Sequence, residues 1–244
     1  MSTALRTPTT TYTPKDPTRK AAAVAGTFYL ITFISSIPAL LLLGPVLDNP
    51  DYIVGAGPDT SVLWGSFLDF VNAIAAVGTA VALYPVVRRH NHSLALGFVT
   101  SRMLEAAVIM IGVVSLLAVV TLRQELAGAA GTDPAALVTT GQSLVAVRDW
   151  TFLLGPGFMA GINALLLGTL MYRSRLVPRV IPTMGLVGAP LLLAANSATF
   201  FGLNDQLSAW SLLATLPVAA WELSLGVWMV VKGFRASPIA ADTV

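Results

Sequence analysis

Residues 94–122 read LALGFVTSRMLEAAVIMIGVVSLLAVVTL, and this stretch decides the class of fold. A helix that spans a bilayer needs roughly 20 predominantly apolar residues, and this segment is long enough. It nevertheless carries Arg102 and Glu105, although a charge at the centre of a membrane helix costs at least about 2.5–3.5 kcal/mol. Because residues three apart lie on one helical face, we expect both side chains to point into a bundle that compensates their charges.

The composition of the whole chain is typical of a polytopic membrane protein. Of its 244 residues, 55% are hydrophobic and only 11% are charged, whereas a soluble domain carries about 25% charged residues. The absence of cysteine excludes disulfides, thiolate metal sites and cysteine nucleophiles. The formal net charge of +2 is too small to indicate a nucleic-acid partner.

Six apolar segments of membrane-spanning length follow one another along the chain. We expect spans at 21–43, 61–87, 94–122, 150–172, 180–203 and 209–231, so the predicted fold is all-α, a polytopic bundle of six transmembrane helices. Residues 1–20, rich in Thr and Pro, predict a disordered cytoplasmic tail. Residues 21–234 predict a single transmembrane domain, and 235–244 a short C-terminal tail.

The charges of the connecting segments alternate along the chain. Eleven of the fourteen cations precede the first span, follow the sixth, or join the second to the third or the fourth to the fifth: Arg6, Lys15, Arg19, Lys20, Arg88, Arg89, Arg173, Arg175, Arg179, Lys232 and Arg235. The remaining connections are mainly acidic. By the positive-inside rule, both termini are expected on the cytoplasmic side.

Two long connections are expected on the opposite side. Residues 44–60 contain Gly-Pro and Asn-Pro turn signals, and Tyr52 with the apolar pair after it is expected to fold back onto the membrane surface. Asp133 followed by Pro134 is typical of a helix N-terminus. A helix from Pro134 is therefore expected to lie along the membrane surface and to turn inward at Trp150.

Several polar residues fall at membrane depth. At about 1.5 Å per residue, Asp69, Glu105 and Glu222 are expected roughly 12–20 Å deep and close enough to converge near the middle of the bundle. With Arg102 as the one buried cation, at least one of these acids is expected to be protonated. The candidates for ligand binding or proton relay are Asp69, Asn72, Arg102, Glu105, Asn163, Asn196, Trp221 and Glu222.

Structural interpretations of the same residues remain open. The Arg102–Glu105 pair is also suited to tying its helix to neighbouring helices. Asn163 and Asn196 are of the type that commonly hydrogen-bonds between membrane helices. The segment Gly155–Gly157, which contains a central proline, favours a kink and close packing over a ligand-binding loop.

The chain shows no recognised catalytic motif. Nucleotide-binding, zinc-protease and serine-hydrolase patterns are all absent from the sequence, so no catalytic residue is assigned. His90 and His92 favour a solvated turn over a metal site, and we expect neither a metal nor a cofactor.

Residues 20–234 resemble a bacterial membrane-protein family known as domain of unknown function 4386. The resemblance rests on the segments GTFYLITFISSIPALLL, LDNPDYIVGAG, VGTAVALYPVVRRHN, LALGFVTSRMLEAA and PVAAWELSLGVWMVVKGF, in this order. It implies a six-helix protein of the bacterial inner membrane, with Arg102, Glu105 and Glu222 as characteristic positions and an acid near Asp69. It implies no activity, substrate or cofactor.

Three functions are compatible with this pattern. The first is binding or transport of a small polar or amphipathic molecule at the acid–arginine cluster, with possible proton coupling. The second is a structural or sensory protein whose charges fix helix register. The third is an intramembrane enzyme with a protonated carboxyl acting on a lipid or isoprenoid, which would need an apolar cavity walled by Trp221, Trp228 and Phe158.

The bilayer is the one expected partner besides such a ligand, and the oligomeric state is left open. Two small-residue pairs, Gly157 with Gly161 and Gly185 with Gly188, suit dimerisation and internal packing equally well.

Overall fold

The structure, a computed structural model, describes residues 17–55 and 57–235, and within these ranges it contains helices and no strands. The elements are α1 (Pro17–Leu47), α2 (Asp59–Val87), α3 (His92–Leu126), α4 (Pro134–Phe152), the π-helix η1 (Leu153–Met159), α5 (Ala160–Ser174), α6 (Val180–Phe200) and α7 (Ala209–Val231). Since α4, η1 and α5 run on without interruption, the elements form six spans that are long and apolar enough to cross a membrane. The predicted six-helix transmembrane bundle is confirmed.

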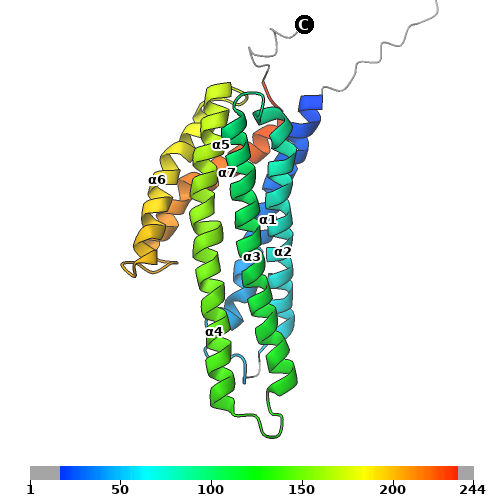
Figure 1. Ribbon diagram of the computed structural model, residues 1–244, viewed down its shortest axis with the longest axis vertical. Helices are drawn as coiled ribbons and strands as arrows, with labels where there is room; N and C mark the ends of the chain where they lie inside the picture. Colours follow the sequence, from blue (N-terminus) through cyan, green and yellow to red (C-terminus); the bar gives the residue numbers. More distant parts are fainter. Residues whose placement is uncertain (1–16, 56, 236–244) are drawn as a thin grey trace, which may run out of the picture.

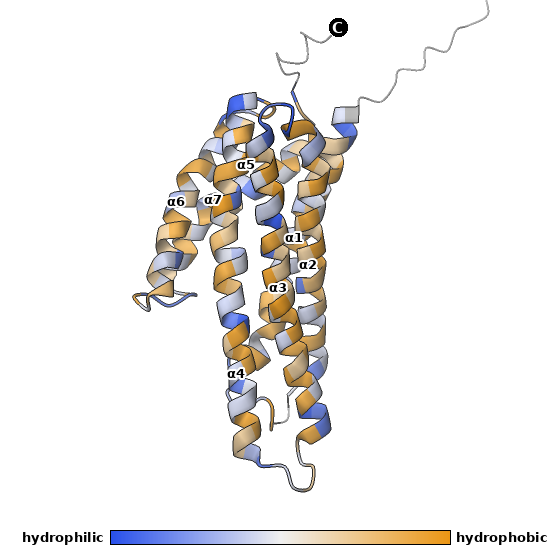
Figure 2. Cartoon of the chain, viewed as in Figure 1, coloured by the Kyte–Doolittle hydropathy of each residue, from blue (hydrophilic) through white to orange (hydrophobic). Residues whose placement is uncertain are grey.

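The spans run alternately in opposite directions, so the start of α1 and the end of α7 lie at the same end of the bundle (Figure 1). We call this the terminal end; it also carries the connections 88–91 and 175–179. The opposite end, called the distal end, carries the connections 48–58, 127–133 and 201–208. Figure 2 shows hydrophilic residues gathered at both ends and along α4, with hydrophobic residues between them.

Each span packs against its neighbours in the sequence, and α1 also packs against α7, which closes the bundle into a ring. Small residues allow the close approach of α1 and α7, because a Cβ on Gly26 would lie 2.6 Å from the carbonyl oxygen of Gly226. Towards the terminal end the ring is filled by an apolar core that includes Leu83, Phe98 and Leu225. The interior on that side is therefore lined by apolar side chains.

The small-residue pairs in the fourth and fifth spans serve internal packing. A Cβ on Gly161 would lie 2.7 Å from the side chain of Leu193, and one on Gly185 would lie 2.5 Å from the ring of Trp221. Both glycines are therefore occupied by contacts within the chain, as one of the two open interpretations expected.

The spans differ in length, and this difference shapes the distal end. The 35 residues of α3 extend over about 52 Å, whereas the 21 residues of α6 extend over about 31 Å, one hydrocarbon thickness. The rings of Trp150 on α4 and Phe200 on α6 lie 5.5 Å apart, which places the distal end of α6 level with Trp150. The distal parts of α3 and α4 therefore project beyond the α6–α7 hairpin (Figure 1).

The prediction that residues from Pro134 lie along the membrane surface is wrong. Asp133 does cap the helix by accepting a hydrogen bond from the N–H of Ala135, but α4 then runs straight into the fourth span. The Gly155–Gly157 segment does not break the helix, because the widened turns of η1 accommodate Pro156. The fourth span is consequently 41 residues long, with Trp150 near its middle.

The distal connection after α1 is also placed differently from the expectation. Tyr52 and Ile53 are 2% and 1% exposed because they pack against the distal ends of the helices, with Ile53 directly against Gly141 of α4. The prediction that they fold onto the membrane surface is wrong. Arg123 of α3 fixes the connection by donating to the carbonyl oxygens of Gly55 and Gly57.

At the terminal end α1 begins at Pro17, so the last four residues of the segment expected as a tail are helical. Arg19 donates hydrogen bonds to the carbonyl oxygens of Met229, Val230 and Val231, which ties α1 to the last turn of α7. The remainder of the two expected tails, 1–16 and 236–244, lies outside the described residues.

Candidate functional site

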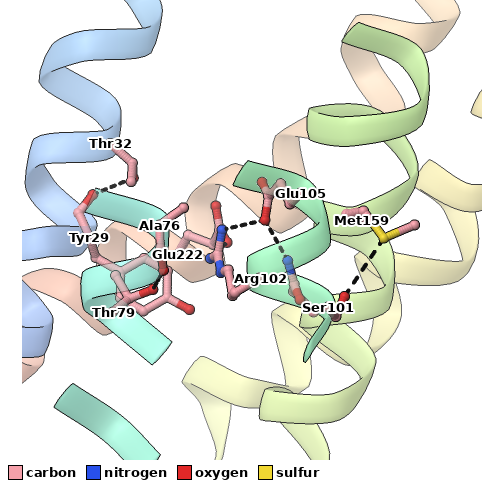
Figure 3. A network of polar contacts seen from close by, with 10 residues as sticks. Tyr29, Thr32, Ala76, Thr79, Ser101, Arg102, Glu105, Met159 and Glu222 are labelled. Atoms are coloured by element: carbon pink, nitrogen blue, oxygen red, sulfur yellow. Dashed lines mark hydrogen bonds and ion pairs between the residues drawn. The ribbon is translucent and has the colours of Figure 1, made fainter. Parts of the chain in front are cut away.

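The interior of the ring contains a cluster of charged and polar side chains from three spans. Arg102 of α3 donates through Nη1 to Oε2 of Glu105 at 2.9 Å and through Nη2 to Oε1 of Glu222 of α7 at 2.6 Å. Asn163 of α5 donates to the same Oε2 of Glu105 at 2.7 Å. We call these four residues the central cluster; Figure 3 shows the two carboxyl groups on either side of the guanidinium.

Aromatic rings complete the surroundings of Arg102. Its guanidinium carbon lies 5.1 Å from the ring centroid of Tyr29 on α1 and 5.8 Å from that of Phe98, distances at which a cation is attracted to a ring face. The hydroxyl of Tyr29 and the Nε of Arg102 are buried and have no hydrogen-bond partner among the described residues. These two groups are therefore available for further hydrogen bonds.

The central cluster carries more acid than base. Arg102 is 3% and Glu105 6% exposed, and the side chain of Glu222 is 14% exposed. If both carboxyls are ionised, the cluster has one negative charge in excess, which is costly where water is scarce. A proton or another cation bound at the cluster would remove that cost.

The cluster lies about midway through the membrane-spanning region. Arg102 is ten residues after His92, the first residue of α3, and ten before Gly112, which is about 15 Å in each direction. Gly112 packs against Arg148, because a Cβ on Gly112 would lie 2.9 Å from Cδ of Arg148. Arg148 is two residues before Trp150, which lies level with the distal end of α6. This depth makes the four polar side chains a functional candidate.

A second buried ion pair lies nearer the distal end. Arg148 of α4 donates to Oδ2 of Asp69 on α2 at 3.0 Å, and its guanidinium carbon lies 4.8 Å from the ring centroid of Phe152. Both charged residues are buried. Arg148 fits there because Gly112 of the facing helix leaves room for its side chain.

A small cavity adjoins this second pair. Its volume is about 40 Å³, enough for one or a few water molecules. The polar residues Ser36, Asn72 and Thr151 share its wall with Asp69 and Arg148, and Pro156 of η1 closes one side. The cavity thus offers hydrogen-bonding groups from α1, α2 and α4 around one ion pair.

The structure brings some of the candidate residues together and separates others. Arg102, Glu105, Asn163 and Glu222 form one cluster, as expected for the first two and for Glu222. The expectation that Asp69 joins them is wrong, because Asp69 binds Arg148. The sequence interpretation missed Arg148 because it placed residue 148 before the fourth span, outside the membrane, although the residues around it are apolar and helical in character.

The other three candidates have separate surroundings. Asn72 lines the small cavity. Asn196 of α6 is buried against Gly157 of η1. A Cβ on that glycine would lie 3.3 Å from Nδ2 of Asn196. Trp221, which precedes Glu222, is fully buried against Gly185, and its indole nitrogen has no hydrogen-bond partner in the described part of the chain.

The described residues contain no group of three or more His, Cys, Asp or Glu side chains able to hold a metal ion. At the terminal end, burial and the neighbouring charge of Arg89 lower the pKa of His90, which favours its neutral form in the turn.

One comparison with known proteins identifies a family. The family model described as domain of unknown function (DUF4386) matches residues 24–233, a range that contains both buried ion pairs. No curated protein and no solved structure matches the chain.

Proposed function

Because the chain belongs to the DUF4386 family, whose description names no activity, we propose a function from the site alone: proton-coupled binding and transport of a small polar or amphipathic molecule. The observation that carries this proposal is the sharing of one buried guanidinium, that of Arg102, by two carboxyls on different spans. Following the loop charges, the terminal end is assigned to the cytoplasm and the distal end to the opposite side.

The proposed coupling follows from the excess of acid over base. Of the groups that face the cluster, Tyr29, Arg102, Glu105 and Glu222 are titratable. One proton on either carboxyl neutralises the cluster, and a cationic or strongly polar ligand at the same place does so as well. Proton and ligand therefore compete, and such competition couples their movements.

Conformational change is required for the ligand to reach the cluster. The apolar core closes the terminal side, and neither described cavity is lined by a residue of the cluster. Two helix irregularities lie close to it. A Cβ added to Gly155 of η1 would lie 3.6 Å from the carbonyl oxygen of Glu105, and Pro217 lies inside α7, five residues before Glu222. Irregular helices of this kind supply hinge points.

The test is mass spectrometry of small molecules that co-purify with the protein in lipid nanodiscs, at pH 6 and pH 8. The wild type is compared with Glu105→Gln, Glu222→Gln and the control Glu125→Gln, which removes an exposed acid at the distal end. We expect a defined molecule in the wild type and the control that is lost in the two cluster variants. Bulk lipid alone in all four samples would contradict the proposal.

A structural clamp is the second candidate, and one observation favours it. The contact between Arg102 and Glu222 joins α3 to α7 across the ring, and every charged group of the cluster is paired. In that case the glutamine variants lose stability at both pH values and change no co-purifying molecule. The enzyme interpretation is not proposed further, because Trp221, Trp228 and Phe158 line neither described cavity.

A further inference from the structure

A second cavity, of about 300 Å³, opens at the distal end. Its floor is apolar and buried, with Val46 from α1, Ile53 from the connection and Val119 from α3. Its rim is exposed and polar, and includes Gln142 and Asp149 of α4. This volume is at the lower end of the range for small-molecule sites, about 300–1,000 Å³. We call this cavity the distal groove.

The distal groove lies between α1 and α4, where the bundle is incomplete. The α6–α7 hairpin ends level with Trp150, so the parts of α1 and α4 beyond that level have no span packed over the seam between them (Figure 1). The groove occupies this seam at the boundary of the hydrocarbon region. A molecule approaching from the membrane surface on the distal side meets it directly.

The groove and the small cavity at Arg148 are stacked along the same two helices. On α1 the small cavity is lined by Leu40 and the groove by Val46, six residues or about 9 Å apart. On α4 the adjacent residues Arg148 and Asp149 line one cavity each. Two fully buried leucines, Leu43 and Leu116, belong to the apolar layer between the two levels.

The charge along this seam is negative. Asp149 at the rim has no ion-pair partner among the described residues, because the guanidinium of Arg148 is turned to Asp69. Along the two stacked cavities, two carboxyls, those of Asp69 and Asp149, stand against the single guanidinium of Arg148. An anion entering the groove gains no free cation at its rim, whereas a cation meets Asp149 beside an apolar floor.

We propose that the distal groove binds a cationic amphipathic molecule, an amine or quaternary ammonium with an apolar body. The apolar body packs on Val46, Ile53 and Val119, and the cationic group lies beside Asp149. This proposal rests on the binding function proposed above and names the ligand class and the point of entry for it. The Leu43–Leu116 layer then separates the entry site from the ion pairs deeper in the bundle.

The test uses benzyltrimethylammonium, its uncharged carbon isostere and benzenesulfonate as probes. Binding is measured calorimetrically on the full chain in nanodiscs of zwitterionic lipid. We expect the cation to bind, Asp149→Asn to weaken it about threefold to tenfold, and Ala146→Phe, which fills the groove from its exposed rim, to weaken it at least about tenfold. The matched controls Glu125→Gln and Thr140→Phe, on exposed residues that line neither cavity, are expected to bind like the wild type.

Tighter binding of benzenesulfonate, or equal binding of the cation by Ala146→Phe and the wild type, would overturn the proposal. Thermal unfolding of each variant shows whether it is folded, and Gln142→Trp replaces Ala146→Phe if the latter is not. Failure of the two proposals is distinguishable. If the groove variants weaken binding of the cation while co-purification by Glu222→Gln depends on pH as it does for the wild type, the groove proposal stands and the proton coupling is refuted. The reverse pattern refutes the groove proposal alone.

Discussion

Arg102 and Glu222 are 120 residues apart in the sequence, yet Nη2 of the first lies 2.6 Å from Oε1 of the second in the middle of the bundle. The same guanidinium binds Glu105, so a single cation serves two carboxyls from two spans. This imbalance distinguishes the central cluster from the one-to-one pair of Asp69 and Arg148, and it determines how the cluster responds to substitution.

Arg102→Met is expected to destabilise the protein by about 3–5 kcal/mol, because removal of the shared cation leaves two buried carboxyls without a cationic partner. The triple variant Arg102→Met/Glu105→Gln/Glu222→Gln removes the uncompensated charge and is expected to recover most of the loss. Thermal unfolding in nanodiscs measures both. A triple variant no more stable than Arg102→Met would show that charge is not the cause.

Asp69 and Arg148 are expected to be energetically coupled by about 1–3 kcal/mol, as is usual for contacting residues in one ion pair. The coupling is measured by a double-mutant cycle of Asp69→Asn and Arg148→Gln, with unfolding in nanodiscs as the readout. Because Glu105 does not contact this pair, the cycle of Asp69→Asn with Glu105→Gln should be additive within about 0.5 kcal/mol. A larger coupling in the second cycle would contradict the separation of the two sites.

Gly112→Ala is expected to destabilise the protein by about 1–3 kcal/mol through overpacking. The added Cβ would lie 2.6 Å from Oγ1 of Thr151 and 2.9 Å from Cδ of Arg148, so Arg148 must move away from Asp69. Gly97→Ala on the same helix is the matched control, since its Cβ would meet Leu166 at an ordinary 3.5 Å. Equal unfolding midpoints for the two variants would refute the close approach at Gly112.

The alkaline pH dependence of stability is expected to contain a contribution from Tyr52, which lies outside the spans. Burial, and then the hydrogen bond to Asp59, raise the pKa of Tyr52 to about 12. Because this value lies above the unfolded value of about 10, the contribution is complete below pH 10 and is lost as the pH rises towards 12. The difference in unfolding midpoint between the wild type and Tyr52→Phe should therefore shrink between pH 9 and pH 11; a constant difference would contradict the assignment.

The sequence alone was sufficient for the number of spans and for part of the central cluster. Apolar length is a local property, so composition places six helices without knowledge of their packing. Arg102 and Glu105 share a face because they are three residues apart. Glu222 was expected near them from its depth alone, since depth depends only on distance along its own helix.

The remainder depended on packing that a single sequence does not encode locally. Whether Asp69 meets Glu105 or Arg148 is decided by how α2 and α4 are each positioned against α3, and Arg148 reaches Asp69 only because α4 is straight. The straight course in turn depends on η1, in which widened turns absorb the Gly155–Gly157 segment that elsewhere breaks a helix. The distal groove exists because the α6–α7 hairpin ends before α1 and α4 do. This is a relation between the lengths of different spans, and no sequence motif marks it.

The assignment of the terminal end to the cytoplasm is testable because the chain has no cysteine. Ser93→Cys introduces an exposed thiol in the first turn of α3, at the terminal end, and Ala130→Cys introduces one in the 127–133 connection at the distal end. Both substitutions leave the charges of the loops unchanged, so the bias that sets orientation is preserved. With a membrane-impermeant maleimide applied to intact cells, we expect Ala130→Cys to react and Ser93→Cys to react only after the membrane is opened. The opposite pattern would place the distal groove on the cytoplasmic side, and ligand entry through it would then proceed from the cytoplasm.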